Sequence, residues 1–293
     1  MIIIKLQGGL GNQMFQYACG KSVGLQKRTS VKLDISTLKE GVQSKHFSVR
    51  SFELNIFKAT LYHASDKELN LFFLKSIHLK IWYKWLKSNR FYTEPHFFWD
   101  KNLTTIRGNL FLNGFWQSEK YFAEFEKNIR DDFTFIADRN QKTMDKENEI
   151  LLCNAISIHV RRGDYISSPT ANSFHGVNSL EYYETAMSKI EVLIDNPFYF
   201  LFSDDVLWAK EHLAKNRQNI TIIEHNKGKD SWQDMYLMSK CKHHIIANSS
   251  FSWWGAWLNK NVNKVVIAPK KWFANKEKNN QTQDLIPTSW IRL

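Results

Sequence analysis

The stretch Ala155-Ile-Ser-Ile-His-Val160 runs directly into Arg161-Arg-Gly-Asp164, so an apolar, β-rich run ends in a charged loop. A short run of this kind, bounded by turn-forming residues, predicts a buried strand. Similar runs recur downstream, separated by helical patterns, at 198–202, 220–223, 244–247 and 264–268. Strands that alternate with helices form right-handed βαβ units around a parallel sheet. We therefore predict a Rossmann-like domain in the second half of the chain.

The N-terminal half begins in the same way. The apolar run Ile2-Ile-Ile-Lys-Leu6 leads into Gly8-Gly-Leu-Gly-Asn12, then a helical pattern, and another strand candidate at 31–35. This order of strand, glycine loop, helix and strand predicts a second α/β unit. Because 293 residues are long for one core, we predict two domains, 1–145 and 146–293.

Two further segments have helical patterns. Residues 65–90 combine an apolar face with basic side chains that include Lys75, Lys80, Lys84, Lys87 and Arg90, and residues 119–130 follow Ser118, a candidate N-cap. A basic amphipathic helix either lies on an anionic membrane surface or docks on its own domain with a solvated basic face. The sequence leaves both readings of 65–90 open.

The charge balance favours an anionic partner. The chain has 40 Lys and Arg residues against 29 Asp and Glu residues, for a net charge of +11. Nucleic acid, membrane headgroups and a phosphorylated small molecule all fit that charge. No RNP, zinc-finger or helix-turn-helix signature is present, so we predict no nucleic-acid partner.

The cysteines and the lengths of the apolar runs indicate in which cellular compartment the protein is expected. Cys19, Cys153 and Cys241 are odd in number and far apart, which fits neither a disulfide framework nor a zinc site. The N-terminal apolar run is too short for a signal peptide, and no stretch of about 18 apolar residues occurs. We therefore expect a cytoplasmic protein, with peripheral contact at the inner face of the cytoplasmic membrane left open.

Polar side chains collect after the predicted strands of the second half. Arg161 and Arg162 follow the first strand, Asp204 and Asp205 the second, and Asn248, Ser249 and Ser250 the fourth. Ligands bind at the carboxyl edge of such a sheet. Arginine matches phosphate oxygens, and serines that open a helix offer free amides to an anion. This edge is predicted to bind a phosphorylated ligand, although a salt bridge between an arginine and Asp164 explains part of the pattern equally well.

Two motifs have weaker signals. The glycine loop lacks dinucleotide or P-loop spacing, so Asn12 either donates to a ligand or caps the following helix. The pair Asp204-Asp205 has no ligand-spaced histidine nearby and is typical of a helix cap, so no metal is predicted. Trp253, Trp254 and Trp257 are predicted core residues, with Gly255 and Ala256 permitting close approach.

Taken together, four motifs resemble glycosyltransferase family 11, the α-1,2-fucosyltransferases. They are residues 8–17 (GGLGNQMFQY), 159–165 (HVRRGDY), 202–205 (FSDD) and 243–256 (HHIIANSSFSWWGA), and the ending DLIP at 284–287 followed by Trp290 is also similar. They span nearly the whole chain, and residues 40–110 carry the least resemblance.

The resemblance implies a GT-B fold, with two Rossmann-like domains facing across a cleft, and inverting transfer from GDP-fucose without metal or other cofactor. Arg161 then corresponds to the catalytic arginine on the donor β-phosphate, aided by Asn12, Ser249 and Ser250. His159 and Asp234 correspond to guanine-binding residues. Arg162, Asp164 and Asp204 correspond to residues that support the site.

The implied reaction transfers L-fucose to the 2-hydroxyl of a terminal or subterminal β-galactoside in a glycan, in O-antigen synthesis. The acceptor is a galactose-containing oligosaccharide or a lipid-linked form of it. The alternatives are a fucosyltransferase of another linkage and a basic protein that binds nucleic acid or membrane without catalysis. For the base on the acceptor hydroxyl the sequence offers five candidates without choosing among them: Asp34, Glu94, Asp164, His175 and Glu181.

Overall fold

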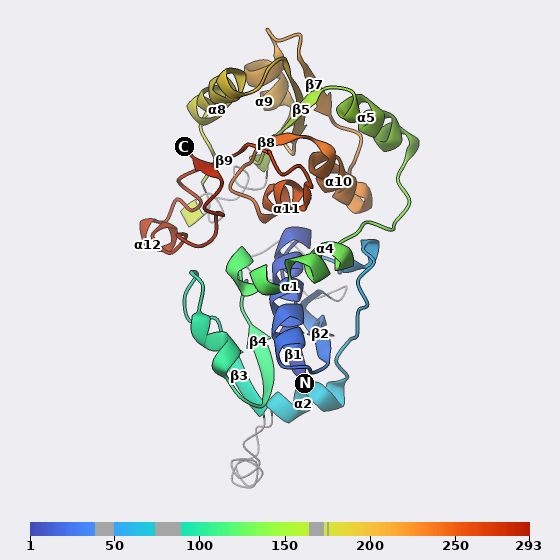
Figure 1. Ribbon diagram of the computed structural model, residues 1–293, viewed down its shortest axis with the longest axis vertical. Coiled ribbons are helices and arrows are strands. Elements are labelled where there is room, and N and C mark those ends of the chain that lie inside the picture. The colour runs from blue at the N-terminus through green and yellow to red at the C-terminus, as the bar shows by residue number, and fades with distance from the viewer. Residues whose placement is uncertain (39–49, 74–88, 164–172, 175) are drawn as a thin grey trace. The chain divides into compact units, whose positions relative to one another are not determined.

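The computed structural model describes residues 1–38, 50–73, 89–163, 173–174 and 176–293 (Figure 1). The chain forms two compact units. Unit 1 comprises Met1–Ala137 and Gln283–Leu285, and unit 2 comprises Asp138–Thr282 and Ile286–Leu293. The predicted boundary at 145 falls inside α5 (Gln141–Leu151), which packs against α10 (Trp232–Lys240) of unit 2.

Unit 1 contains a four-stranded parallel sheet of order β2-β1-β4-β3. Its strands are β1 (Ile2–Lys5), β2 (Val31–Asp34), β3 (Asn89–Thr93) and β4 (Asn109–Asn113). The three isoleucines of β1 are fully buried, as expected for a strand covered on both faces. Helix α1 (Leu10–Gln26) lies against β1 at Gly20, where an added Cβ would sit 3.0 Å from Ile4.

The helical patterns predicted in unit 1 are only partly confirmed. Within the described residues, α2 covers Asp66–Phe73, whereas Asn89 and Arg90 begin strand β3; residues 74–88 lie outside the description. Pairing of β3 with β4 outweighs the helical periodicity at this end of the segment. The segment after Ser118 forms the 3-10 helices Glu119–Tyr121 and Ala123–Phe125 and then α4 (Glu126–Asp132), and Ser118 is the predicted cap.

Unit 2 contains a six-stranded parallel sheet of order β10-β9-β8-β5-β6-β7. Its strands are β5 (Asn154–Val160), β6 (Pro197–Ser203), β7 (Ile220–Ile223), β8 (His243–Ile245), β9 (Val266–Ala268) and β10 (Ile291–Arg292). Renumbered from β5, this is the doubly wound order 3-2-1-4-5-6. The strand order reverses between β5 and β8, and that reversal is where such sheets bind ligands.

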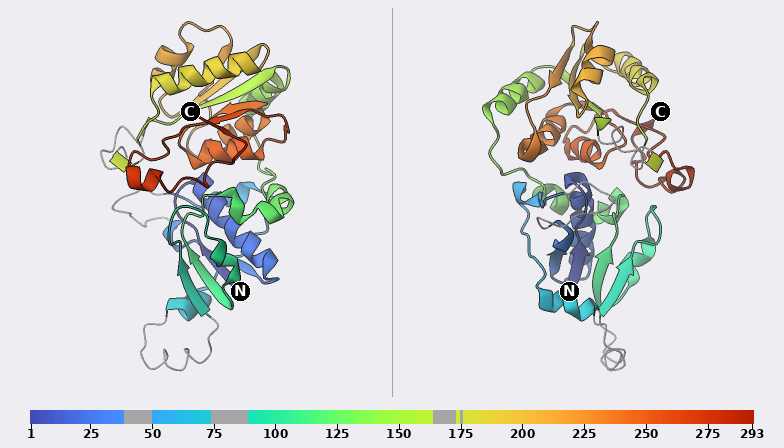
Figure 2. Two further views of the ribbon diagram at one scale, coloured as in Figure 1. Left: turned by 60° about the vertical axis from the view of Figure 1, so that its left-hand side comes forward. Right: turned by 180° about the vertical axis from the view of Figure 1, so that it is seen from behind.

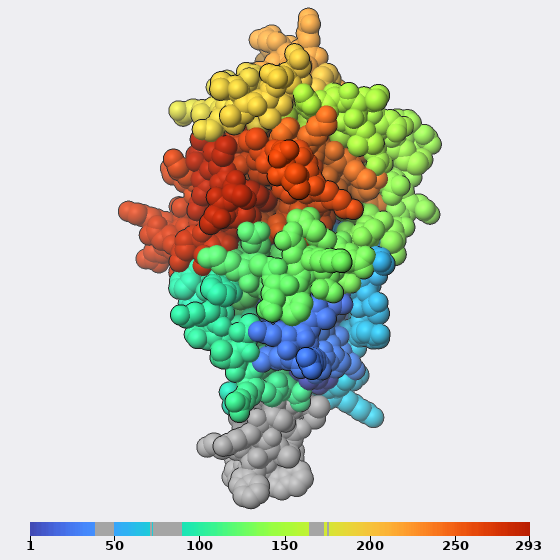
Figure 3. Space-filling view, viewed as in Figure 1, coloured from blue at the N-terminus to red at the C-terminus, as the bar shows by residue number. Residues whose placement is uncertain are grey.

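Side chains of β5 alternate between two differently covered faces. Ile156, Ile158 and Val160 join the core formed with α8 (Leu180–Leu193), while His159 lies near Phe251 of α11 (Ser250–Leu258) on the opposite face. Figure 2 shows α8 and α11 on opposite sides of the sheet. In the space-filling view α8 (yellow) lies at the surface of unit 2 (Figure 3). Ser179 caps α8, its side chain accepting a hydrogen bond from the Tyr182 amide.

The remaining elements complete unit 2. They are α9 (Val206–Ala209), continued by a π-helical turn at Lys210–Ala214, the 3-10 turn Gly228–Asp230 and α12 (Lys276–Asn279). The tryptophans Trp253, Trp254 and Trp257 of α11 are buried, and Gly255 lies so close to α10 that a Cβ would stand 2.8 Å from Met238. This confirms the predicted core role.

The structure also bears on the cysteines and on membrane crossing. Cys19, Cys153 and Cys241 are free thiols. Among the described residues, no helix is long and apolar enough to span a bilayer.

Candidate active site

The carboxyl edge of the unit 2 sheet carries most of the predicted site. Arg161 follows β5, Asp204 follows β6, Asp234 lies in the first turn of α10 after β7, and Ser249 and Ser250 open α11 after β8. These segments are far apart in sequence, and the parallel sheet brings their starting points to one edge.

Arg161 and Asp204 form the charged pair at this edge. Arg161 Nη1 lies 3.1 Å from Asp204 Oδ2, and the arginine side chain is 26% exposed. The other oxygen of Asp204 accepts the Arg162 backbone amide at 2.8 Å. Asp204 thus fixes both the backbone and the guanidinium of the loop that follows β5. A guanidinium held in this way and still reached by solvent is suited to bind a phosphate.

The Arg162 side chain contacts other side chains of unit 2. Its Nε lies 3.3 Å from Asp205 Oδ2, and its guanidinium carbon lies 4.0 Å from the centre of the Trp208 ring. Asp205 in turn caps α9 by accepting from the Trp208 amide. These contacts support the proposal that Arg162 braces the loop. The sequence showed the cap-like Asp205 but gave no sign of the stacking by Trp208.

His159 is buried at the end of β5. Its ring centre lies 5.9 Å from that of Phe251, beside Ser250. Burial, aided by the nearby Arg161 charge, lowers the pKa of His159 to about 3, so the imidazole is neutral at physiological pH. Within the described part of the chain, its Nδ1 has no hydrogen-bond partner. A buried polar atom of this kind is costly unless something bonds to it, which fits contact with a ligand.

The serine loop is built as a helix start. Ser249 caps α11, its hydroxyl accepting from the Phe251 amide. Asn248 before it is anchored, because its side-chain amide donates to the carbonyls of Gly176 and Trp272 at 3.2 Å each. The amino end of α11, with its positive dipole end, therefore has a fixed place at the strand reversal.

Asp234 occupies a largely buried position in α10. Burial raises the pKa of Asp234 to about 7, and a hydrogen bond from the Asn226 amide, 2.8 Å long, opposes that rise. A carboxylate with a pKa so far from its ordinary value is a candidate for ligand binding. Asn226 has no signal in the sequence, since no motif or spacing connects it to Asp234.

In unit 1 the glycine motif, residues 8–17, is stabilised by hydrogen bonds that its own side chains make. Helix α1 is capped by Gly9, so the alternative that Asn12 is the cap is wrong; Asn12 Oδ1 instead accepts from Gln117 Nε2 at 2.7 Å. The buried Gln13 binds the carbonyls of Gly8 and Ser51 and the amide of Glu53. Gly8 has a φ of +78°, and an added Cβ would meet the Asn12 side chain at 2.6 Å.

The base candidates differ in how they are engaged. Glu94 accepts the amides of Phe115 and Trp116, and the buried Asp34 accepts the Ser36 amide, so both carboxylates serve backbone groups. Glu181 is exposed in the first turn of α8. Asp164, predicted to support the site, and His175 lie outside the described residues.

No cluster of three or more histidine, cysteine, aspartate or glutamate side chains suited to a metal ion occurs in the described part of the chain. Asp204 and Asp205 are already bonded to the arginine loop and to the start of α9.

Comparison with known proteins finds two bacterial relatives that match this chain over nearly their full length. The family model for glycosyl transferase family 11 matches residues 1–293. An Escherichia coli α-1,2-colitosyltransferase is 36% identical over 100% of this chain and 99% of its own length. The Escherichia coli O-antigen biosynthesis glycosyltransferase WbnK is 35% identical over 98% and 99%. Human galactoside α-(1,2)-fucosyltransferase 1 is 24% identical over 50% of this chain and 42% of its own.

Solved structures agree on the fold. NodZ α-1,6-fucosyltransferase, in a crystal soaked with GDP-fucose, aligns with a TM-score of 0.51 at 13% identity, covering 88% of this chain and 91% of that one. Arabidopsis thaliana FUT1, solved as a mutant with GDP, aligns at 0.52 and 12% identity, covering 90% and 69%. These fucosyltransferases confirm the predicted GT-B fold class. With the family model matched from end to end and relatives above 30% identity over their full length, the chain belongs to glycosyltransferase family 11 and is a glycosyltransferase.

Proposed function

We propose that the protein is an inverting galactoside α-1,2-fucosyltransferase that uses GDP-fucose and adds fucose to the 2-hydroxyl of a β-galactoside. The observation that carries this proposal is the placement of Arg161, held by Asp204 after β5, and of the amino end of α11 after β8, on the two strands between which the order of the unit 2 sheet reverses. The E. coli O-antigen relative favours a surface polysaccharide, free or lipid-linked, as the acceptor.

The chemistry follows from where charge develops. As the bond from fucose C1 to the β-phosphate oxygen breaks, negative charge grows on the phosphate and positive character on C1. Arg161 and the first amides of α11 are the groups we assign to the phosphate, with the hydroxyls of Ser249 and Ser250 as further donors. Preorganised donors of this kind typically contribute a factor of about 10² to 10³ in rate each.

The remaining roles follow from the same assignment. His159 and Asp234 are proposed to contact guanine, Arg162, Asp164 and Asp204 to hold the arginine loop, and Asn12 to assist at the phosphates from unit 1. Under this proposal no metal or other cofactor takes part, because arginine and helix amides neutralise the leaving diphosphate.

A second donor has a specific observation in its favour. The α-1,2-colitosyltransferase matches the chain over its full length at 36% identity. Colitose is L-fucose without the 3-hydroxyl group, so a site for one can accept the other unless it hydrogen-bonds that hydroxyl. A site that does so rejects the analogue by a large factor, because its buried polar group is left unpaired.

The test is GDP release from GDP-fucose and from GDP-colitose against a panel of β-galactosides, with each acceptor matched by its 2-deoxygalactose analogue. We expect release that depends on acceptor and vanishes with the 2-deoxy analogue, and an α-1,2 linkage in the product by NMR. Equal release with the 2-deoxy analogue would refute the linkage, and a strong preference for GDP-colitose would reassign the donor.

A further inference from the structure

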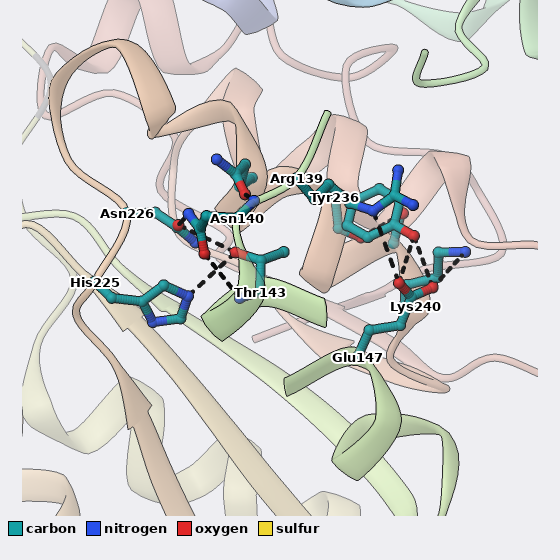
Figure 4. A network of polar contacts seen from close by, with 10 residues as sticks. Arg139, Asn140, Thr143, Glu147, His225, Asn226, Tyr236 and Lys240 are labelled. Atoms are coloured by element: carbon teal, nitrogen blue, oxygen red, sulfur yellow. Dashed lines mark hydrogen bonds and ion pairs between the residues drawn. The ribbon is translucent and has the colours of Figure 1, made fainter. Parts of the chain in front are cut away.

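A series of hydrogen bonds joins the start of α5 to Asp234. Figure 4 shows its members Asn140, Thr143 and Asn226. The Thr143 backbone amide donates to Asn140 Oδ1 at 2.9 Å. Asn140 Nδ2 donates to Asn226 Oδ1 at 3.0 Å, and Asn226 Nδ2 donates to Asp234 Oδ1 at 2.8 Å. The Thr143 hydroxyl lies 3.2 Å from Asn226 Oδ1 and 3.1 Å from His225 Nε2, so its single proton can be donated to either atom. Thr143 and Asn226 are buried, so water does not readily replace these bonds.

The donor and the acceptor of each hydrogen bond are fixed by the Thr143 backbone amide, where the series begins. A backbone amide can only donate, so the atom of Asn140 that faces Thr143 must be its oxygen. The NH₂ group of Asn140 then faces Asn226, and the atom that receives it must be the Asn226 oxygen. Asn226 consequently presents its NH₂ group to Asp234. The two ends of an asparagine amide are often hard to assign, but here the backbone of α5 leaves one choice.

We propose that Asn140 and Asn226 are positioning residues for guanine recognition, with α5 setting the polarity of both amides so that Asp234 is held as a hydrogen-bond acceptor. The inference rests on the proposed role of Asp234. Guanine offers two adjacent donors, N1–H and N2–H, and a carboxylate held as an acceptor can receive both. If the Asn226 oxygen faced Asp234 instead, the carboxyl group would have to keep a proton and donate it, losing much of its capacity to accept.

A second set of contacts holds α5 in register on α10. The Glu147 carboxylate accepts the Tyr236 hydroxyl at 2.7 Å and pairs with Lys240 at 3.0 Å (Figure 4). Arg139 lies over the Tyr236 ring, 4.6 Å from its centre. Gln233, beside Asp234, accepts the Asn140 backbone amide at 3.0 Å. The chain of amides is thus carried by two helices that are joined along their length.

Substitution of Asn140 separates polarity from helix capping. Aspartate and serine both cap helices well, so Asn140→Asp and Asn140→Ser should each keep α5 folded. In Asn140→Asp an oxygen replaces the NH₂ group that faces Asn226, which favours turning the Asn226 amide over. In Asn140→Ser the donor is removed without a new acceptor, so nothing favours turning the Asn226 amide over. Asn226→Asp is a further variant that leaves the cap untouched and places an oxygen against Asp234.

The experiment measures the Kd of GDP and of inosine diphosphate, which lacks the N2 amino group, by calorimetry. We expect the wild-type protein to prefer GDP by about tenfold, roughly one hydrogen bond to a charged group. Asn140→Asp and Asn226→Asp should weaken GDP binding about tenfold and remove most of the preference, whereas Asn140→Ser should stay within about threefold of wild type. Circular dichroism checks that each variant is folded.

The outcomes separate the inference from the proposed function. Asp234→Ala is the reference: if it retains the full preference for GDP, guanine is read elsewhere and the role of Asp234 fails. If Asp234→Ala loses the preference while Asn140→Asp or Asn226→Asp, folded, keeps it, the role of Asp234 stands and the inference about the amides is wrong. Equal losses in Asn140→Asp and Asn140→Ser would also overturn it, because capping alone would then explain the effect.

Discussion

Two loops occupy the same topological position, one in each unit. Each follows the first strand of a parallel sheet, after β1 in unit 1 and after β5 in unit 2. In unit 1 the buried Gln13 and Gln16 bond to backbone groups of their own and neighbouring segments. In unit 2 Arg161 pairs with Asp204, and its side chain remains 26% exposed. Polar residues in a motif therefore indicate a ligand site only when their side chains are not used to hydrogen-bond the surrounding backbone.

The contrast has a physical basis in the two side chains. A glutamine amide carries both donors and an acceptor, so it can satisfy carbonyl and N–H groups of a tight loop together. A guanidinium carries only donors and a fixed charge, which one carboxylate neutralises without saturating. The first kind of loop should act mainly on stability, and the second mainly on catalysis.

Arg161→Ala should give the largest effect, a loss of about 10² to 10³ in kcat with GDP-fucose and a galactoside, since the charge that stabilises the leaving phosphate is removed. The melting temperature should change little, because a partly exposed ion pair contributes about 1 kcal/mol or less. Steady-state kinetics and calorimetry measure the two quantities. Turnover near wild type in a folded variant would remove Arg161 from the mechanism.

Asp234→Asn should stabilise the folded protein at high pH, by about 4 kcal/mol at pH 8. Burial raises the pKa of Asp234 from 3.8 to about 7, so the native state retains a proton that the unfolded state has lost between these values. Stability therefore falls as pH rises from about 4 to 7, and the asparagine variant escapes this loss. Urea unfolding at pH 4 and pH 8 tests the sign: the variant's gain should be near zero at pH 4, and an equal gain at both would contradict it.

Gln13→Ala should have the opposite sign, with a loss of about 2 kcal/mol. The substitution leaves the carbonyls of Gly8 and Ser51 and the amide of Glu53 without their side-chain partner in a partly buried setting. Gln141→Ala is the matched control, because that glutamine is exposed on α5 and its loss should cost less than about 0.5 kcal/mol. If the two variants unfold at the same urea concentration, the glycine motif does not hold unit 1 together as described.

Much of the fold could be predicted because local and tertiary signals agree. The apolar runs of unit 2 became its strands, and Ser118 caps the helical turn Glu119–Tyr121 as predicted. The signals disagree at residues 89–93, where helical periodicity continues but pairing with β4 makes a strand. The short edge strand β10 has only two residues and was missed, since nothing local distinguishes it from a loop.

Residues of the candidate site could be predicted only where a residue type at that position has one dominant chemical role. Arginines and serines after strands indicate phosphate from the sequence alone. The partner of Arg161 within the described residues is Asp204, 43 residues later along the chain, and only the register of β5 with β6 brings them together. Asn140 and Asn226 were missed for the same reason, because an asparagine in a loop is most often a cap or a turn residue and its partners are decided by tertiary packing.

The smallest expected effect is that of chelation, which should leave the rate unchanged within error. If Arg161 and the amides of α11 carry the charge of the leaving diphosphate, a divalent ion has no charge left to neutralise. Two carboxylates beside the arginine loop within the described residues are also engaged, since Asp204 bonds to Arg161 and Asp205 caps α9. An ion would have to displace these bonds to bind there. Transfer assays with and without EDTA, followed by added Mg²⁺ or Mn²⁺, measure this directly. A loss of activity with EDTA that either ion restores would mean that the loop after β5 and the start of α11 do not suffice to stabilise the leaving diphosphate. The donor site would then also require a metal ion, which the comparison of the two loops leaves out.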